Sequence, residues 1–281
     1  MELGLGRSEI VRLLDRYELS PSRALGQNFL TDPNVAVKIA KLAKISNLDY
    51  VVEIGPGIGS LTVVLAEIAH SLVAIEFDRH LVSVLEQVLT LRNIANVEVV
   101  RGDALTADFA ELLKTSPSWK LVANLPYNIS TPLVLTILES HQMITEMLVM
   151  VQREVGERMC ATPGPGYSQV ALKLNYFAKA KVVSVVSREV FMPKPNVDSV
   201  LVQIKRRPQI ELDLDQKSYD TVFSLSRLAF ANRRQMIRRT LSRVISINDI
   251  QSVGIDPSRR PETLGLNDWK LLAEVVNEAR G

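Results

Sequence analysis

The sequence predicts an α/β fold in which a mostly parallel, mixed sheet carries helices on both faces and is followed by a small helical domain. From residue 50 onward, short β-branched runs alternate with amphipathic helical patterns, as in a parallel sheet with crossover helices. A glycine-rich turn directly follows the first of these runs. The strand pattern stops after Arg206-Arg207-Pro208. A chain of 281 residues with 47% hydrophobic composition can hold one large core and a smaller second one.

An N-terminal arm and one helix precede the sheet. Residues 1–31 form the arm, which carries a helical pattern around Ser8–Tyr17. Asp32 and Pro33 mark the start of the next helix, because aspartate is a good N-cap and proline fits the first helical position. We expect this helix to run through Asn34–Lys44.

Five buried strands follow, each separated from the next by a helical pattern. They are short and rich in β-branched residues, as buried strands of a parallel sheet are. The predicted strands are Tyr50–Ile54, Leu72–Glu76, Val97–Arg101, Lys120–Ala123 and Met147–Gln152. Their alternation with helices predicts parallel neighbours in one sheet.

Two further apolar runs, Ala180–Val186 and Ser199–Ile204, follow each other without a convincing helix between them. We expect them to form an antiparallel pair at an edge, which would make the sheet mixed. After Pro208 the pattern is helical, with breaks at Gly254-Ile-Asp-Pro257 and Arg260-Pro261. The chain therefore divides into a first domain, 1–206, and a helical second domain, 207–281.

Composition limits the chemistry and the location of the protein. The single cysteine, Cys160, excludes an internal disulfide framework, and three scattered histidines have no spacing suited to metal ligands, so we expect no metal. The N-terminus lacks the pattern of a signal peptide, and no apolar stretch approaches the ~18 residues of a membrane-spanning helix. We therefore expect a cytoplasmic protein. Nothing in the sequence suggests an obligate oligomer, so we expect a monomer.

The net charge of +2 says little about partners, but the charge is unevenly placed. No acidic side chain lies between Thr221 and Asn248. The same span holds Arg227, Arg233, Arg234, Arg238, Arg239 and Arg243. A solvated helix balanced by charges from elsewhere is the plain alternative, but ordinary surface helices mix both signs. We therefore expect these arginines, with Arg233, Arg234 and Arg238 among them, to follow the phosphates of a polynucleotide.

The glycine-rich turn, Gly55-Pro-Gly-Ile-Gly59, indicates a nucleoside cofactor. It follows a predicted strand and opens a helix over Ser60–Ala69, so its backbone can approach a ligand closely. Ser60 stands where the dinucleotide fingerprint has its third glycine. The turn also carries no lysine or arginine to meet phosphates. These features favour S-adenosylmethionine over NAD, and a purely structural tight turn is the alternative.

Two acids at the ends of neighbouring strands strengthen the cofactor hypothesis. Glu76 lies 21 residues beyond Gly55, where an acid can accept hydrogen bonds from both ribose hydroxyls of a nucleoside. Asp103 ends the third strand and can accept a hydrogen bond from the exocyclic amine of adenine. Each acid alone could instead cap the following helix. Their joint position beside a glycine turn favours a binding site.

Asn124-Leu125-Pro126-Tyr127 closes the fourth strand and suits an amino group on a base. An adenine amine is a poor nucleophile because its lone pair is delocalised into the ring. Acceptors on its two N–H bonds, the Asn124 side-chain oxygen and a main-chain carbonyl of Leu125 or Pro126, would release that lone pair toward a methyl donor. Tyr127 can stack on a base taken out of its helix. These residues alone fit an amine on DNA, on RNA or on a smaller molecule, and an ordinary strand-to-helix turn is the alternative.

Seven ordered motifs resemble the ribosomal RNA adenine dimethyltransferase family, in particular its bacterial small-subunit branch. They are Leu25-Gly-Gln-Asn-Phe-Leu30, Glu53-Ile-Gly-Pro-Gly-Ile-Gly-Ser-Leu-Thr62, Glu76-Phe-Asp78, Gly102-Asp103-Ala104, Asn124-Leu-Pro-Tyr-Asn-Ile-Ser130, Val151-Gln-Arg-Glu-Val155 and Phe191-Met-Pro-Lys-Pro-Asn-Val-Asp-Ser199. The resemblance implies a Rossmann-like class I methyltransferase that uses S-adenosylmethionine. Its implied substrate is N6 of two adjacent adenosines in a hairpin near the 3′ end of 16S rRNA, in the small subunit or an assembly intermediate.

The same resemblance implies roles for individual residues. The cofactor contacts would be Asn28, Leu30, Gly55, Glu76, Asp103 and Asn124. Asn124, Leu125, Pro126 and Tyr127 would hold the target amine, and Phe191 would form a second aromatic wall for the base. A core phenylalanine is the alternative for Phe191. Two departures from the family pattern, Ser22-Arg23-Ala24 and Gln235, remove basic residues and concern RNA affinity only.

Three alternatives to this function stay open from the sequence. The related enzyme that dimethylates 23S rRNA and confers macrolide resistance shares most of the motifs, although the Leu-Gly-Gln arm and the Val-Asp-Ser ending favour the small-subunit branch. A ribosome-assembly factor that acts by binding is disfavoured by the intact Asn124-Leu-Pro-Tyr127. A nicotinamide oxidoreductase is disfavoured by Ser60 and by the missing acid-base pair.

Overall fold

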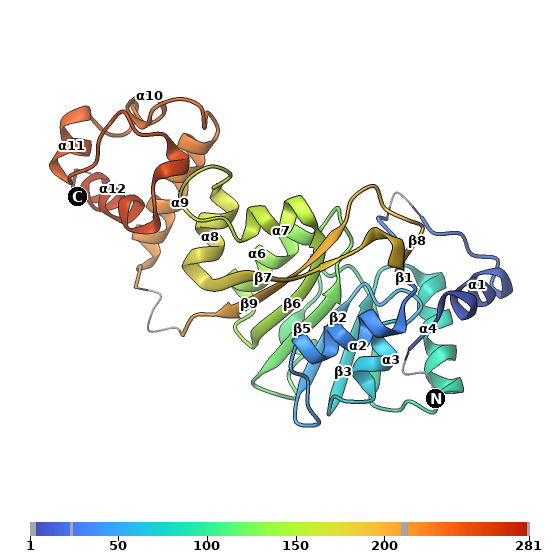
Figure 1. Cartoon of the computed structure of the whole chain (residues 1–281). Helices are drawn as coiled ribbons and strands as arrows, with labels where there is room; N and C mark the ends of the chain where they lie inside the picture. Colours follow the sequence, from blue (N-terminus) through green and yellow to red (C-terminus); the bar gives the residue numbers. More distant parts are fainter. Residues whose placement is uncertain (1–3, 23–24, 209–212, 280–281) are drawn as a thin grey trace. The chain divides into compact units, whose positions relative to one another are not determined.

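The computed structural model describes residues 4–22, 25–208 and 213–279, so the departure at Arg23 and Ala24 lies outside the described residues. The chain forms two compact units (Figure 1). The first comprises Met1–Gly156 and Ala180–Arg206, and the second comprises Glu157–Lys179 and Arg207–Gly281. Residues 157–179 thus belong to the second unit, although they lie within the predicted first domain, 1–206. No helix in the described part of the chain is both long enough and apolar enough to cross a membrane.

A seven-stranded sheet forms the centre of the first unit, in the order β4-β3-β2-β5-β6-β9-β7. Its strands are β2 (Tyr50–Ile54), β3 (Ser71–Glu76), β4 (Val97–Arg101), β5 (Trp119–Asn124), β6 (Ile144–Gln152), β7 (Ala178–Val186) and β9 (Ser199–Arg206). Strands β2 to β6 pair in parallel, while β9 runs antiparallel to β6. The predicted mostly parallel, mixed sheet is confirmed, and β9 and β7 lie at one edge as expected.

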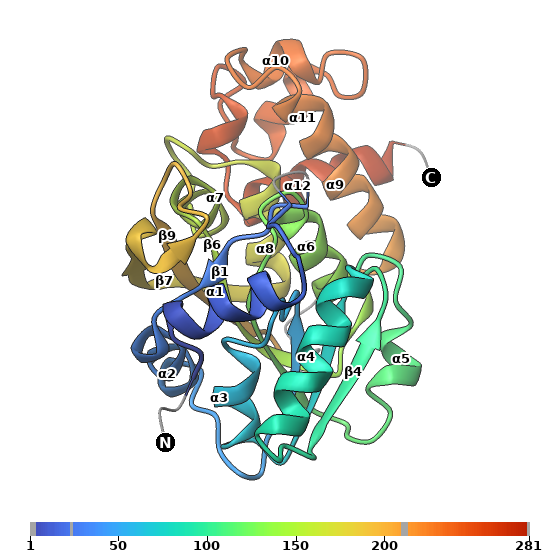
Figure 2. The same cartoon turned by 90° about the vertical axis from the view of Figure 1, so that its right-hand side faces the viewer.

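Helices and short turns of the first unit lie around this sheet. They are α1 (Arg7–Arg16), α2 (Pro33–Leu42), α3 (Thr62–Ala66), α4 (Arg79–Leu91), α5 (Phe109–Leu112), α6 (Ser130–Ser140) and η1 (Arg188–Val190). A further helix, α7 (Arg153–Met159), begins in the first unit and ends in the second. Helix α2 begins as predicted, since the Asp32 side chain accepts a hydrogen bond from the Asn34 amide at 2.9 Å. Helix α4 packs against β3 and β4 (Figure 2).

The helix after the glycine turn is shorter than predicted. The sequence predicts it over Ser60–Ala69, whereas α3 covers Thr62–Ala66. The helix therefore begins two residues later than predicted and ends three residues earlier, and Leu61 is its N-cap residue. The loop after β2 is therefore longer than predicted, and the helix that follows it has only about one and a half turns.

A second, two-stranded sheet was not predicted. Strand β1 (Phe29–Leu30) of the N-terminal arm pairs antiparallel with β8 (Phe191–Met192). The Thr31 amide and hydroxyl both donate to the Val190 carbonyl, at 2.8 and 3.0 Å. These bonds attach the arm to a segment about 160 residues away in the chain, which is why no local pattern indicated them.

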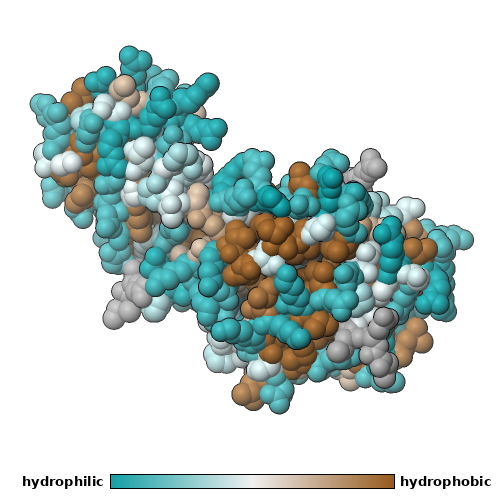
Figure 3. Space-filling view, viewed as in Figure 1, coloured by the Kyte–Doolittle hydropathy of each residue, from teal (hydrophilic) through white to brown (hydrophobic). Residues whose placement is uncertain are grey.

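Strand β7 is an edge strand that leaves apolar side chains exposed. Val182 is 38% and Val185 53% exposed. Apolar residues gather on the face of the first unit that Figure 3 shows, over the strands that Figure 1 labels β7, β6 and β5. The exposed Lys179 and Lys181 also lie on β7. Lysines at a sheet edge oppose pairing with a further strand.

The described elements that lie wholly within the second unit are helical. They are α8 (Gln169–Phe177), α9 (Gln216–Phe230), α10 (Ile237–Thr240), α11 (Ile247–Ser252), η3 (Pro261–Thr263) and α12 (Leu266–Glu278). Helix α12 packs along α9. Trp269 of α12 is fully buried, with its ring 6.0 Å from that of Phe230. Aromatic packing of this kind contributes most of the apolar burial in a small helical core.

Gly156 of α7 leaves no room for a side chain. A Cβ at this position would overlap the Val200 Cγ2 and lie 3.0 Å from the Val202 Cγ2. We expect Gly156→Ala to lower the free energy of unfolding by about 1–3 kcal/mol, because overpacking of the sheet face exceeds the gain in helix propensity. Urea denaturation measures the loss. Gly6→Ala is the control, since no atom lies within 4 Å of a Cβ there, and an equal effect at both positions would contradict the prediction.

Candidate active site

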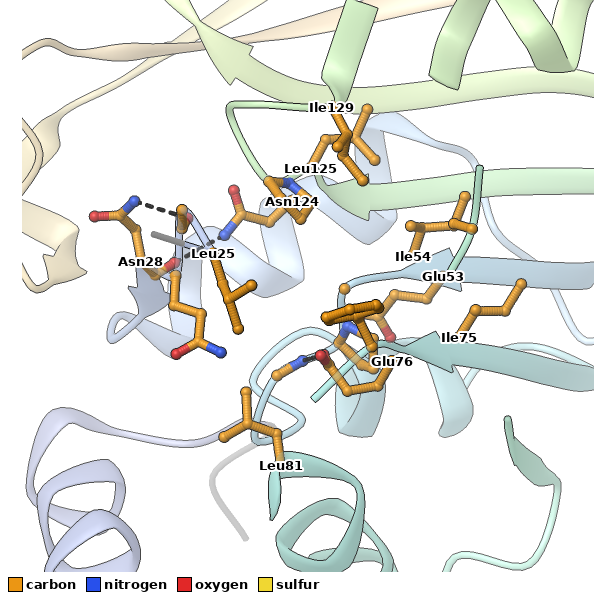
Figure 4. A pocket seen from close by; sticks show the side chains of 18 of the residues that line it. Leu25, Asn28, Glu53, Ile54, Ile75, Glu76, Leu81, Asn124, Leu125 and Ile129 are labelled. Atoms are coloured by element: carbon orange, nitrogen blue, oxygen red, sulfur yellow. Dashed lines mark hydrogen bonds between the residues drawn. The ribbon is translucent and has the colours of Figure 1, made fainter. Parts of the chain in front are cut away.

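A pocket lies where the parallel strands β2, β3, β4 and β5 end (Figure 4). This is the edge of an open α/β sheet at which ligands bind. It is lined by all six predicted cofactor contacts, Asn28, Leu30, Gly55, Glu76, Asp103 and Asn124. Leu125, Pro126 and Tyr127 line it as well. The fold therefore brings the two predicted halves of the site into one cavity.

The glycine turn packs closely against both of its neighbours. Gly55 and Gly57 have φ values of +69° and +60°, a region that favours glycine. A Cβ on Gly55 would lie 3.2 Å from Pro126 Cδ, and one on Gly57 would lie 3.0 Å from Phe29 Cε1. Glycine at these positions thus lets the cofactor loop touch the Asn124–Tyr127 turn on one side and the N-terminal arm on the other.

Glu76 holds the glycine turn through its carboxylate. Oε2 accepts a hydrogen bond from the Gly57 amide at 3.0 Å, and Oε1 accepts one from the Asp78 amide at 2.9 Å. Burial raises the pKa of Glu76, and these two amides act in the opposite direction. Each oxygen keeps a further lone pair, so the carboxylate is held rigidly and can still accept bonds from a ligand.

Asp103 does not cap the following helix, α5, whose N-cap is Asp108. The Asp103 Oδ1 accepts a hydrogen bond from the Leu105 amide at 2.9 Å, which closes the turn after β4. The same side chain is half-exposed and lines the pocket. One carboxylate oxygen caps the turn, and the other is available to an amine in the pocket.

Asn124 is oriented by the N-terminal arm. Its Nδ2 donates to the Asn28 carbonyl at 3.0 Å, while the Asn28 side chain donates to the Gly26 carbonyl at 3.1 Å (Figure 4). Because the amide nitrogen is used in this way, the Asn124 side-chain oxygen is left as an acceptor. The sequence indicated Asn28 only through the family resemblance. The hydrogen bond comes from the main-chain carbonyl of Asn28, so the residue type gives no hint of it.

Tyr127 is held by a residue that sequence reasoning did not single out. Its hydroxyl pairs with the hydroxyl of Ser199 at 3.1 Å, and Ser199 is fully buried at the start of β9. Burial raises the pKa of the Tyr127 phenol. In the sequence, Ser199 is only the last residue of a motif that resembles the family. The motif indicates that Ser199 belongs to a functional region, but it does not predict the hydrogen bond to Tyr127.

Phe191 is not brought to this pocket. It is 1% exposed, belongs to the core and pairs through β8 with Leu30 of the arm. The described residues that line the pocket do not include it. In this structure Phe191 fits the alternative of a core phenylalanine, and its role as a wall for the base stays a prediction.

The pocket suits a cationic nucleoside better than a phosphate or a metal. Among the described residues that line it, the charged side chains are Glu53, Glu76 and Asp103, with no lysine, arginine or histidine. Within the described ranges no group of three or more His, Cys, Asp or Glu side chains could hold a metal ion. An acidic pocket with ribose and amine acceptors fits S-adenosylmethionine, whose sulfonium carries a positive charge.

The predicted basic surface belongs to the second unit. Arg227, Arg233, Arg234, Arg238, Arg239 and Arg243 are all exposed. They lie on α9, on the turn after it, on α10 and on the turn that follows. Exposed arginines without acids nearby in sequence suit a phosphate backbone.

Comparison with known sequences identifies the same family that the sequence motifs resemble. The family described as "Ribosomal RNA adenine dimethylase" matches residues 20–278. Two proteins named "Ribosomal RNA small subunit methyltransferase A" illustrate the similarity. The one from Acidothermus cellulolyticus is 40% identical over 280 residues, covering 96% of this chain and 94% of that protein. The one from Clostridioides difficile is 36% identical over 275 residues, covering 94% of each.

Two solved structures are similar over most of the chain. A dimethyladenosine transferase from Plasmodium falciparum has a TM-score of 0.73 at 26% identity, covering 89% of this chain and 98% of that one. The 23S rRNA methyltransferase ErmE has a TM-score of 0.69 at 26% identity, covering 89% of this chain and 99% of that one. One of these two structures is named for 23S rRNA, so likeness of fold alone does not identify the rRNA substrate of this chain.

Proposed function

The chain belongs to the ribosomal RNA adenine dimethylase family, and on this premise we propose that Asn124-Leu125-Pro126-Tyr127 holds the target adenine for methyl transfer. The protein is an S-adenosylmethionine-dependent rRNA adenine dimethyltransferase. Its relatives are named for the small subunit, so its substrate is N6 of adenosine in 16S rRNA. The 23S enzyme stays the alternative that the ErmE likeness would fit.

The cofactor would be held along the ends of β2, β3 and β4. When bound, S-adenosylmethionine supplies a methyl group on a sulfonium centre. Glu76 would accept hydrogen bonds from the ribose hydroxyls through lone pairs that the Gly57 and Asp78 amides leave open. Asp103 would accept one from the adenine amine of the cofactor. Asn28, Leu30 and Gly55 complete the lining.

The orientation of Asn124 carries the mechanistic proposal. With Nδ2 bound to the Asn28 carbonyl, its side-chain oxygen can accept one N6–H bond of the target adenine. The Pro126 carbonyl already accepts from the Ile129 amide at 3.2 Å, so we favour the Leu125 carbonyl as the second acceptor. Two acceptors in fixed positions leave the N6 lone pair directed at the methyl group, and no strong base is needed. Tyr127 would stack on the base.

Methyl labelling tests the substrate directly. The purified protein should transfer labelled methyl groups from the donor to small-subunit particles, and mass spectrometry should find N6,N6-dimethyladenosine at two adjacent positions of 16S rRNA. Labelling of large-subunit RNA alone would replace this assignment with the 23S alternative. Binding to small subunits without labelling would favour the assembly-factor alternative.

The arginine surface gives a prediction about RNA binding. Reversing the charge of Arg233 and Arg234 to glutamate should weaken binding to 16S rRNA and reduce the slope of log K against log salt by about 1 to 2, since each phosphate contact releases counterions. Lys38→Glu/Lys41→Glu on α2 is the matched control, because both lysines are exposed and lie outside this surface. An unchanged slope in the arginine variant would remove these residues from the interface.

We further propose that the two parts of the chain have different functions. Residues 1–206 would carry catalysis and 207–281 would bind RNA, with Arg238 beside Arg233 and Arg234 in the interface. The protein would act as a monomer, in the cytoplasm, on the small subunit or one of its assembly intermediates. Light scattering of the free protein tests the oligomeric state.

A further inference from the structure

The turn Asn124–Tyr127 is held at both of its ends by segments that are distant in the sequence. At one end, the Asn124 side chain donates to the Asn28 carbonyl of the arm (Figure 4). At the other end, the Tyr127 hydroxyl lies 3.1 Å from the hydroxyl of Ser199, the first residue of β9. Ser199 is fully buried, whereas Tyr127 is half-exposed and lines the pocket. The hydroxyl of Tyr127 is therefore anchored inside the protein while the residue still borders the ligand space.

The pairing of the strands fixes the place of Ser199. Strand β9 runs antiparallel to β6, and Ser199 is paired with Gln152 at the end of that strand. Strand β6 pairs in turn with β5, where Asn124 is the partner of Met150. The Tyr127 side chain thus reaches from the turn after β5, past the end of β6, to the start of β9. A hydroxyl on a paired central strand is a rigid hydrogen-bond partner, because its backbone is held on the ladder.

Asp198, the residue before Ser199, joins the loop ahead of β9 to its surroundings. Its Oδ2 accepts a hydrogen bond from Arg153 Nη2 at 2.9 Å, and its Oδ1 accepts one from the Arg188 amide at 3.1 Å. The Asp198 carbonyl also accepts from the Arg153 amide at 3.0 Å. The Arg188 guanidinium donates to the Asn196 carbonyl at 2.7 Å. These bonds close the loop on itself and attach it to the residue that follows β6, so the start of β9 is fixed from both sides.

The two anchors of the turn belong to one continuous frame. Asn28 directly precedes β1, and β1 pairs with β8. Residues 193–198 lead from β8 into β9, which begins at Ser199. The carbonyl that orients Asn124 and the hydroxyl that anchors Tyr127 are therefore parts of the same arm–β8–β9 segment. This frame sets the side-chain oxygen of Asn124 and the ring of Tyr127 in fixed positions relative to each other.

We propose that Ser199 is a positioning residue for methyl transfer, whose hydroxyl holds the Tyr127 ring in the orientation that stacks on the target adenine. This inference rests on the function proposed above, in which Tyr127 contacts the base. Ser199 itself is not among the described residues that line the pocket, so it acts through Tyr127. A ring free to turn about its side-chain bonds would let the base shift, and a misplacement of about 1 Å is enough to slow a reaction between oriented groups.

Ser199→Ala and Tyr127→Phe each remove one hydroxyl of the pair and leave the ring in place. We expect each to slow single-turnover methyl transfer on pre-bound small-subunit particles about 3- to 10-fold, the size of one net hydrogen bond. The affinity for the particles should change less than about twofold. Ser118→Ala is the matched control, because its hydroxyl lies 3.1 Å from that of Thr145 just before β5, at the strand end away from the site. A wild-type rate in Ser199→Ala would overturn the proposal.

The double variant distinguishes positioning of Tyr127 from general support of the fold. If Ser199 acts through the Tyr127 hydroxyl, then Ser199→Ala has nothing further to remove in the Tyr127→Phe protein, and the double variant should be as fast as either single variant. Rate losses that multiply would assign Ser199 a structural role alone and contradict the proposal. Should Ser199→Ala fail to fold, a wild-type rate in Tyr127→Phe contradicts it equally, since the ring would then need no anchor.

The same assay distinguishes failure of this inference from failure of the proposed function. If the wild-type protein transfers no methyl group to small-subunit particles, the proposed function is wrong and the positioning role of Ser199 is wrong with it. If the wild-type protein transfers methyl groups and both single variants match its rate, only the positioning role is wrong.

Discussion

Replacing Asn124 by alanine is expected to lower the rate of methyl transfer at least about 100-fold, while RNA binding is largely kept. The side-chain oxygen is the acceptor that directs the N6 lone pair, and loss of one such preorganised group typically costs 100- to 1,000-fold in turnover, as a rough guide. The variant also loses the bond from Nδ2 to the Asn28 carbonyl, which is one of the contacts between the arm and the catalytic turn. Single-turnover labelling with pre-bound RNA measures the transfer step.

Two further variants separate the parts of this effect. Asn124→Asp keeps an acceptor but removes the donor to Asn28, so it should remain strongly impaired if orientation by the arm matters. Asn47→Ala changes an exposed asparagine away from the pocket and serves as the control. Retention of more than a tenth of the wild-type rate in Asn124→Ala would show that acceptance by this side chain is not central to the transfer.

Replacing Glu53 by glutamine is expected to stabilise the ligand-free protein above neutral pH. Burial raises the pKa of Glu53 in the folded chain to about 8, from the usual glutamate value of 4.5. Between these two values the folded chain holds a proton that the unfolded chain has lost, so the stability contributed by this group is complete below pH 4.5 and falls as pH rises toward 8. The variant has no such group, so its advantage should grow across this window to a few kcal/mol, on the order of the pKa difference.

Urea denaturation at several values between pH 5 and pH 8.5 measures this advantage. The quantity to compare is the difference in unfolding free energy between Glu53→Gln and wild type, since other groups titrate equally in both. Glu86→Gln, on the exposed side of α4, controls for the amide substitution. A difference that does not change with pH would mean that Glu53 is ionised in the ligand-free fold.

Short-range features of the fold could be predicted because their causes lie within a few residues. Strands β2 and β4 have the predicted bounds, since β-branched runs between helical patterns have few alternative placements. The N-cap of α2 was predicted for the same reason, as Asp32 and the amide it accepts from are two residues apart. The helix after the glycine turn was wrong at both ends, since α3 covers only Thr62–Ala66 of the predicted Ser60–Ala69.

Contacts between distant segments could not be predicted, even where each residue was recognised. Asn28 and Asn124 were both assigned to the site, but the bond that orients Asn124 crosses 96 positions of sequence. Phe191 was assigned to the base pocket through the family resemblance alone, and neither its burial nor its pairing with Leu30 of the arm could be read from the sequence. The hydrogen bond between Tyr127 and Ser199 likewise joins residues 72 positions apart, so the sequence did not predict it.

The sequence by itself determined the mixed α/β sheet, the order of its motifs and the chemical class of the site, since strand periodicity, the glycine turn and residue types are local properties of the chain. Only the tertiary structure decided how Asn124 is oriented, that the arm is joined to β8, and that Glu53 is buried among acids with no cation in the described pocket. Burial and charge environment arise when several segments pack together, so they exist only in the folded molecule.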